Sequence, residues 1–147
     1  MPGQSQEVVV GLDDGGTAIN ATVLDASGRF LVDELAELPS RVAEGPVVGI
    51  EALAESFTAV LGLTGAPLHA VRAVGLDTPG PASADGVISL RGAVNFVDAA
   101  WRGFDVRGAL EARLGLPVIY NNDANAASLY AHHVHFGPDA VHRYPLR

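Results

Sequence analysis

The chain of 147 residues carries 17 acidic and 9 basic residues, a formal net charge of −8, 48% apolar residues and no cysteine. That length and apolar content fit one folded domain with its own core and exclude a disordered chain, which is poor in apolar residues. The excess of acid argues against a surface for nucleic acid or an anionic membrane, since both attract clustered Lys and Arg. The lack of cysteine excludes disulfides and thiolate metal sites, and no signal peptide or long apolar run is evident. We therefore expect a cytoplasmic globular domain.

The N-terminal part of the chain predicts a three-stranded antiparallel meander. Short apolar stretches at residues 8–12 and 18–24 are typical of buried strands, and a loosely alternating stretch at residues 30–38 predicts a third strand. Residues 13–17 and 25–28 separate these strands and contain the Asp and Gly that are typical of tight turns. Strands joined by such short turns pair in antiparallel fashion.

Downstream, helices alternate with strands. Apolar residues recur at helical spacing between residues 50 and 61, and Asp105 and Gly115 are typical of a helix N-cap and C-terminus. The elements expected after the meander are helix 50–61, strand 70–76, a minor strand 86–90, helix 106–114, strand 116–120 and a helix that begins near residue 123. This order predicts an α/β fold with a right-handed crossover through the first helix.

The sequence DDGGT at residues 13–17 is the first candidate for chemistry. Gly15 and Gly16 would leave backbone N–H groups uncovered for a phosphate, and Thr17 adds a hydroxyl donor. Asp13 has the carboxylate that suits a hydrated Mg²⁺. The same residues also suit a plain hairpin turn, because Asp-Gly between strands is a strong hairpin signal. The motif by itself is compatible with both interpretations.

A second candidate is the sequence DTPGP at residues 77–81, which follows an expected strand. Ligands of open α/β sheets bind beyond the carboxyl ends of strands, where this loop lies. Gly80 would let the backbone approach a hydroxyl-rich ligand. The alternative is a turn that its prolines stiffen.

The third candidate is NNDAN at residues 121–125, again directly after an expected strand. Asp123, at a helix N-terminus, should stay ionised because the helix dipole favours negative charge there. A carboxylate so placed can accept a proton from a substrate hydroxyl that attacks phosphorus. Asn122 and Asn125 can donate and accept hydrogen bonds, which suits a polyol. The alternative is a simple helix cap, since Asp and Asn are the usual capping residues.

Together these segments resemble the ROK family (repressor, open reading frame, kinase), and within it the bacterial glucokinases. The resemblance runs from about residue 8 to residue 137. It rests on DDGGT at 13–17, VGLDTPGP at 74–81, Asn95, Trp101, and GLPV at 115–118, which leads into NDANAA at 122–127.

The resemblance implies an actin-like, ribonuclease-H-like α/β lobe from an ATP-dependent sugar kinase. Such an enzyme uses Mg²⁺ and phosphorylates a hexose at its 6-hydroxyl, and Asp123 is implied to be its catalytic base. The residues implied to bind the sugar are Gly80, Pro81, Asn95, Asn122 and Asp123. The residues implied to bind the nucleotide are Asp13, Gly15, Gly16 and Thr17.

Kinases of this family are much longer and have a second lobe, further Glu and His residues at the sugar and a His/Cys zinc motif. We find no counterpart of these in the sequence, and the absence of cysteine excludes the zinc motif. We therefore expect residues 1–137 to form the N-terminal lobe and residues 138–147 an irregular tail, with the C-terminal lobe absent. A lone lobe should bind ATP poorly and be inactive, and its uncovered apolar surface should favour self-association.

Two other functions stay open, a ROK-type sugar-responsive repressor and an inert or interaction-only fragment. Repressors of this family have a winged helix before the first strand, for which the sequence before residue 8 leaves no room, and a net charge of −8 is unsuited to DNA. The histidines at 132, 133 and 135 suit solvated positions near a helix end better than a metal site. Trp101 and Phe104 are expected to pack in the core, although Trp101 could border the sugar.

Overall fold

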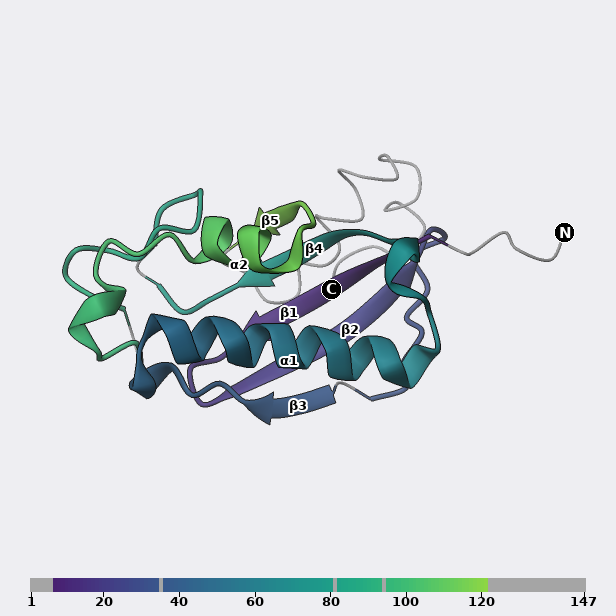
Figure 1. Cartoon of the computed structure of the whole chain (residues 1–147), viewed down its shortest axis with the longest axis horizontal. Coiled ribbons are helices and arrows are strands. Elements are labelled where there is room, and N and C mark those ends of the chain that lie inside the picture. Colours follow the sequence, from purple (N-terminus) through teal and green to yellow (C-terminus); the bar gives the residue numbers. More distant parts are fainter. Residues whose placement is uncertain (1–6, 35, 81, 94, 122–147) are drawn as a thin grey trace, which may run out of the picture.

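The chain forms one mixed five-stranded sheet covered on one face by helices (Figure 1). The computed structural model describes residues 7–34, 36–80, 82–93 and 95–121. The strands are β1 (Val8–Asp14), β2 (Ala18–Asp25), β3 (Ala36–Pro39), β4 (Val71–Asp77) and β5 (Val118–Tyr120). Their spatial order is β3-β2-β1-β4-β5, with β1, β2 and β3 antiparallel and with β4 parallel to both β1 and β5. The expected α/β fold with an N-terminal meander is confirmed.

The third strand is shorter than the sequence predicts. Phe30 makes only an isolated bridge with Leu24, and regular pairing with β2 begins at Ala36. Asp33 and Glu34 are both exposed. In a strand, one of these two successive charged side chains would point toward the core. The strand therefore begins only after them.

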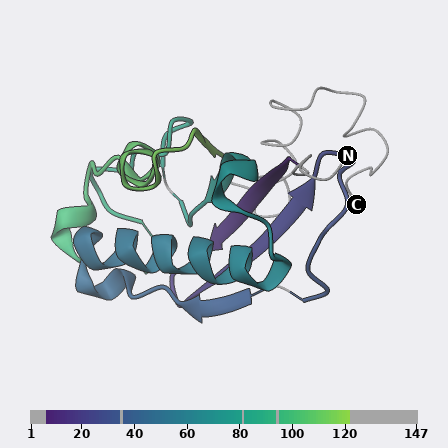
Figure 2. The ribbon, with the colours of Figure 1, turned by 45° about the vertical axis from the view of Figure 1, so that its right-hand side comes forward.

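The two α-helices among the described residues lie on the same face of the sheet. Helix α1 (Pro46–Thr64) begins with a proline and ends at Gly65 in the left-handed conformation, and it crosses in front of β1 and β2 in both views (Figures 1 and 2). Helix α2 (Val106–Leu114) ends at Gly115, and its N-cap Asp105 accepts a hydrogen bond from the Gly108 amide at 2.8 Å. Both α2 caps agree with the sequence prediction, because capping depends on local residue chemistry.

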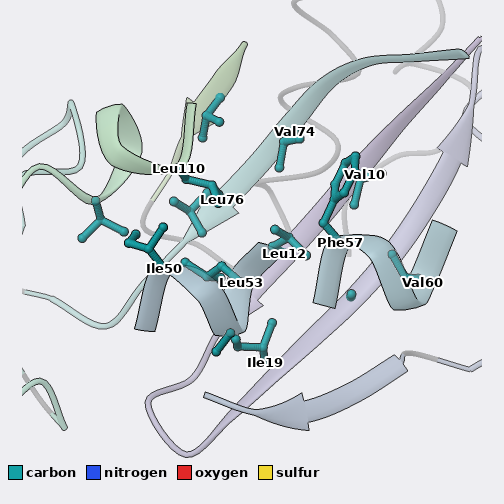
Figure 3. Close-up of a cluster of buried hydrophobic side chains, with 14 of the residues drawn as sticks. Val10, Leu12, Ile19, Ile50, Leu53, Phe57, Val60, Val74, Leu76 and Leu110 are labelled. Carbon is teal, nitrogen blue, oxygen red and sulfur yellow. The ribbon is translucent and has the colours of Figure 1, made fainter. Parts of the chain in front are cut away.

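The main core lies between this face and the helices. Figure 3 shows side chains of α1 and α2 directed toward those of β1, β2 and β4. Its central members are Val10, Leu12, Ile19, Leu53, Phe57, Val60, Val74, Leu76 and Leu110, all buried. Helix α1 is also long and apolar enough to suit a membrane span, but half of it is buried in the protein, as expected for a core helix.

The connection from β4 to α2 is an irregular excursion, and its described residues, 78–80, 82–93 and 95–105, form no strand of the sheet. The predicted minor strand at 86–90 is wrong: Val87 and Ile88 make only isolated bridges, to Asp105 and Ala82. These partners belong to the same excursion and not to the sheet, so the pairing is not extended. Gly86, at a φ of 81°, starts the segment with a backbone turn.

Trp101 anchors this excursion to the core. It is fully buried, and its Nε1–H donates to the Val42 carbonyl at 2.7 Å. Its ring lies 4.5 Å from that of Phe96 and 5.4 Å from that of Phe104, between centroids. The packing role expected for Trp101 and Phe104 is confirmed. Because Trp101 is fully buried, it does not border a sugar in this structure. The expected helix near residue 123, the tail and the histidine cluster lie outside the described residues.

Candidate functional site

A row of polar side chains crosses the sheet face opposite the helices. Asp13 of β1 pairs in register with Asp77 of β4 and, on its other side, with Asn20 of β2. Asn20 in turn pairs with Glu37 of β3. Leu12 points into the main core, so the next residue, Asp13, faces away from it. Four neighbouring strands therefore present Glu37, Asn20, Asp13 and Asp77 side by side.

Asp13 and Asp77 stand at the carboxyl ends of two parallel strands. Neighbouring strands lie about 4.8 Å apart, which is a suitable spacing for two carboxylates around one hydrated cation. Mg²⁺ usually keeps several waters and takes one or two protein carboxylates together with substrate phosphates. A metal ion held by protein side chains alone usually needs three or more of them. Among the described residues, no three His, Cys, Asp or Glu side chains are arranged to hold a metal ion. Two such carboxylates could hold a hydrated Mg²⁺ that a phosphate ligand shares.

The glycine turn follows Asp13 immediately. The sequence predicts that Gly15 and Gly16 leave their N–H groups free, and this is wrong for the structure. The Gly15 amide donates to the Ala18 carbonyl at 2.9 Å, and the Gly16 amide donates to Oδ1 of Asp14 at 3.1 Å. The turn is thus a β-hairpin turn whose two glycine amides bond within it, and Thr17 adds an exposed hydroxyl donor.

Asp14 belongs to β1 and not to the turn, and its side chain is buried. Burial raises the pKa of its carboxyl to about 7, the Gly16 amide lowers it in part, and the charge of Asp13 raises it further. The second oxygen, Oδ2, has no hydrogen-bond partner among the described residues. The sequence did not predict the burial of Asp14, because nothing local distinguishes it from Asp13, its neighbour on the opposite face.

Asn95 lies against this turn. It has a φ of 67°, unusual for a residue other than glycine, and its Nδ2 lies 3.5 Å from the Gly15 carbonyl oxygen. A Cβ atom at Gly16 would come within 2.5 Å of the Asn95 Cβ. The structure thus brings together one residue predicted at the sugar and two predicted at the nucleotide phosphates.

The loop after β4 is tied to β5. Thr78 is buried, and its hydroxyl shares a hydrogen bond of 2.7 Å with that of Tyr120. Burial raises the pKa of Tyr120, the Thr78 bond opposes this, and the Asp77 charge adds to the increase. The Asn121 amide donates to the Leu76 carbonyl at 2.9 Å, so the chain leaves β5 beside the end of β4.

Three of the predicted site residues, Pro81, Asn122 and Asp123, lie outside the described residues. Gly80 is described and exposed, and a Cβ atom there would meet the Ala82 amide nitrogen at 3.7 Å, an ordinary contact. Packing does not require glycine at this position.

A separate groove of about 390 Å³ lies between α1 and α2. Phe57, Leu61, Leu68 and Leu114 are among the residues that line it. It shares no residue with the polar row or the turn, so the candidate site is not this groove.

The family model described as the ROK family matches residues 9–140. The chain belongs to the ROK family. A glucokinase from Streptomyces coelicolor is 32% identical over 123 residues, which cover 82% of this chain and 34% of that protein. The chain thus spans about a third of the length of the curated relatives it matches.

Solved structures of ROK proteins share the fold. The ROK hexokinase from Thermus thermophilus has a TM-score of 0.65 at 40% identity, covering 86% of this chain and 38% of that one. A ROK glucokinase from Streptomyces griseus, in complex with glucose and AMPPNP, has a TM-score of 0.63 at 29% identity, covering 90% and 38%. The expected actin-like ATPase fold is therefore confirmed for this chain.

Proposed function

We propose that this chain supplies the phosphate-binding and sugar-binding elements of a cytoplasmic ATP-dependent hexose kinase. The observation that carries the proposal is the pairing of Asp13 with Asp77 beside the Gly15–Gly16 turn, at the carboxyl ends of β1 and β4. Ligands of open α/β sheets bind at such strand ends. The related Streptomyces griseus glucokinase is in complex with glucose and AMPPNP. These are a hexose and a nucleotide, the two ligands that a hexose kinase binds.

At the phosphate end, Asp13 and Asp77 would hold Mg²⁺ through its waters. When bound, the ion neutralises charge on the transferred phosphate group. The exposed hydroxyl of Thr17 donates a hydrogen bond to a phosphate oxygen. Because the Gly15 and Gly16 amides bond within the hairpin, these glycines serve by allowing close approach and a tight turn.

At the sugar end, the proposal assigns Gly80, Pro81, Asn95 and Asn122 to hold the hexose. Asp123 accepts the proton of the sugar's 6-hydroxyl while the hydroxyl oxygen attacks the terminal phosphorus of ATP. Support comes from Asn121, the last described residue, whose amide donates to the Leu76 carbonyl near the carboxyl end of β4. The helix dipole expected at Asp123 favours its ionised form, which a base requires.

The test is an ADP-release assay with ATP, Mg²⁺ and a panel of hexoses. The protein to assay is a two-lobed kinase whose N-terminal lobe is this sequence. We expect it to phosphorylate a hexose, and we expect its Asp123→Asn variant to lose that activity while it remains folded. We expect the 147-residue chain alone to bind ligands weakly and to release no ADP. Turnover that survives Asp123→Asn would refute the role of the base.

A sugar-responsive regulator is the less favoured alternative. The net charge of −8 is unsuited to DNA, and glucokinases are matched at 32% identity. Sequence-specific DNA binding in a gel-shift assay would favour the regulator instead.

A further inference from the structure

The side chains of Asp14, Ser40 and Asn95 surround the backbone of Gly16. Its N–H donates to Oδ1 of Asp14 at 3.1 Å, and its carbonyl accepts from the Ser40 hydroxyl at 2.7 Å. Asn95 occupies the space in front of its Cα atom. Asp14 comes from the same hairpin, whereas Ser40 and Asn95 come from distant parts of the chain.

Ser40 makes two of the contacts that hold the turn. It is fully buried and follows the last residue of β3. Its hydroxyl donates to the Gly16 carbonyl, and its own N–H donates to the Thr17 carbonyl at 3.2 Å. The register of β3 explains this placement, because Pro39 pairs with Ala18, the first residue after the turn.

The direction of these carbonyls matters for an anionic ligand. A carbonyl oxygen carries partial negative charge and repels a phosphate, whereas N–H and O–H groups attract it. Since Ser40 is fully buried, the oxygens of Gly16 and Thr17 that bond to it are directed into the protein. Without the Ser40 hydroxyl, the Gly16 carbonyl loses its partner, and that peptide plane is free to rotate and present its oxygen to the ligand.

We propose that Ser40 is a positioning residue for the phosphate turn, and that its hydroxyl holds the Gly16 carbonyl oxygen away from the nucleotide. The identity of the ligand, a nucleotide phosphate, rests on the proposed function. The restraint on the turn does not depend on the ligand. The two parts are therefore measured separately.

The chain offers a matched control in Ser56. Ser56 is also fully buried, and its hydroxyl donates to a backbone carbonyl, that of Ala52, at 2.9 Å. It lies within α1, away from the turn. Ser40→Ala and Ser56→Ala thus remove the same buried group from two places, and only the first touches the turn. Ser40→Cys is a second variant, which keeps the volume of the side chain but donates only weakly.

The first measurement is amide hydrogen exchange, by NMR on the 147-residue chain, at Gly15 and Gly16. We expect exchange about tenfold faster at these amides in Ser40→Ala, the change that loss of one hydrogen bond produces. Ser40→Cys should change in the same direction, and Ser56→Ala should leave both amides as in the wild type. Equal exchange at the turn in Ser40→Ala and Ser56→Ala would overturn the restraint.

The second measurement is titration of the same samples with ATP and Mg²⁺. We expect Ser40→Ala to bind about fivefold or more weakly, with Ser56→Ala unchanged. Faster exchange with unchanged ATP affinity would overturn the positioning role. The proposed function expects the wild-type chain to bind ATP weakly, so only a complete lack of chemical-shift change at residues 13–17 with millimolar ATP and Mg²⁺ would count against it. The exchange data decide in either case whether Ser40 restrains the turn.

Discussion

Asp13 and Asp77 lie opposite each other at the carboxyl ends of β1 and β4, although they are far apart in the sequence. Parallel pairing of the two strands creates this relationship, and the helical crossover through α1 makes parallel pairing possible. It places two carboxylates on the sheet face opposite the core, next to the turn at Gly15.

Replacing either carboxylate should weaken binding of ATP in a magnesium-dependent way. We expect Asp13→Asn and Asp77→Asn to reduce affinity for ATP about tenfold with Mg²⁺ present, because each removes a carboxylate charge that holds the ion through its waters. With EDTA present the loss should disappear, since the variants then only remove negative charge near an anion. Asp33→Asn, an exposed charge change outside the site, is the control for both calorimetric titrations. An equal loss with and without Mg²⁺ would contradict the assignment.

Asp14 should make the stability of the fold depend on pH. The pKa of its carboxyl rises from 3.8 to about 7 on folding, chiefly because burial disfavours the charged form. Between these values the folded state binds more protons than the unfolded state, so the free energy of unfolding falls as pH rises through this window and is level above it. The full effect is about 4 kcal/mol.

The variant Asp14→Asn tests this, because the amide cannot ionise and its oxygen can still accept from Gly16. Urea unfolding in metal-free buffer should find Asp14→Asn close to the wild type at pH 4 and more stable at pH 8. Asp25→Asn is the control, because the pKa of Asp25 is lowered on folding and the variant should change stability in the opposite direction. Burial alone would raise the pKa of Asp25, but hydrogen bonds from Ser27 and Arg29 hold it below its usual value. That variant should lose stability at pH 8, and equal pH profiles for the wild type and Asp14→Asn would refute the prediction.

Gly16→Ala should destabilise the protein more than Gly92→Ala. Both glycines have nearly the same positive φ, 86° and 87°, so the backbone cost of about 1–2 kcal/mol is shared. Only at Gly16 does the new Cβ collide, at 2.5 Å from the Asn95 Cβ, whereas nothing lies within 4 Å at Gly92. We expect an additional loss of about 1–3 kcal/mol in thermal unfolding. The excess should vanish in an Asn95→Gly background, and an excess that persists there would exclude this contact as its cause.

Two glycines of α1 should respond in opposite directions to alanine. A Cβ at Gly49 would come within 2.5 Å of the Trp101 ring, while Gly62 has nothing within 4 Å. Gly62→Ala should therefore stabilise the helix by about 0.5–1 kcal/mol, and Gly49→Ala should cost about 1–3 kcal/mol. Chemical unfolding measures both, and the fluorescence of Trp101, the sole tryptophan, should change only in Gly49→Ala. A stabilising Gly49→Ala would show that the ring moves aside easily.

The chain should self-associate through exposed apolar side chains near the site. Val97 is 74% exposed and lies two residues from Asn95. In sedimentation velocity we expect concentration-dependent association of the wild type that Val97→Asp weakens. Phe30→Asp is the control, an exposed apolar residue in the β2–β3 connection. A wild-type chain that stays monomeric at every concentration would contradict this prediction.

Local signals allowed much of the fold to be predicted from the sequence. The apolar stretches of β1 and β2, the capping residues Asp105 and Gly115 and the crossover helix all agree with the structure. Each of these depends on neighbours within a few residues, which the sequence displays directly. The extent of β3 and the absence of a strand at 86–90 did not follow, because strand pairing needs a partner that the sequence does not identify.

The site shows the same division. Residue types at 13–17 and at Gly80 identified candidates for phosphate and sugar, because turn chemistry and functional groups are properties of single residues. Asn95 was implied only by the resemblance to the ROK family. Only the tertiary structure set Asp77 beside Asp13 and placed Ser40 and Asn95 against Gly16. It also turned Asp14 into the interior, where its pKa rises. Register, burial and contact between distant segments exist only once the chain is packed, and they decide which of these groups act together.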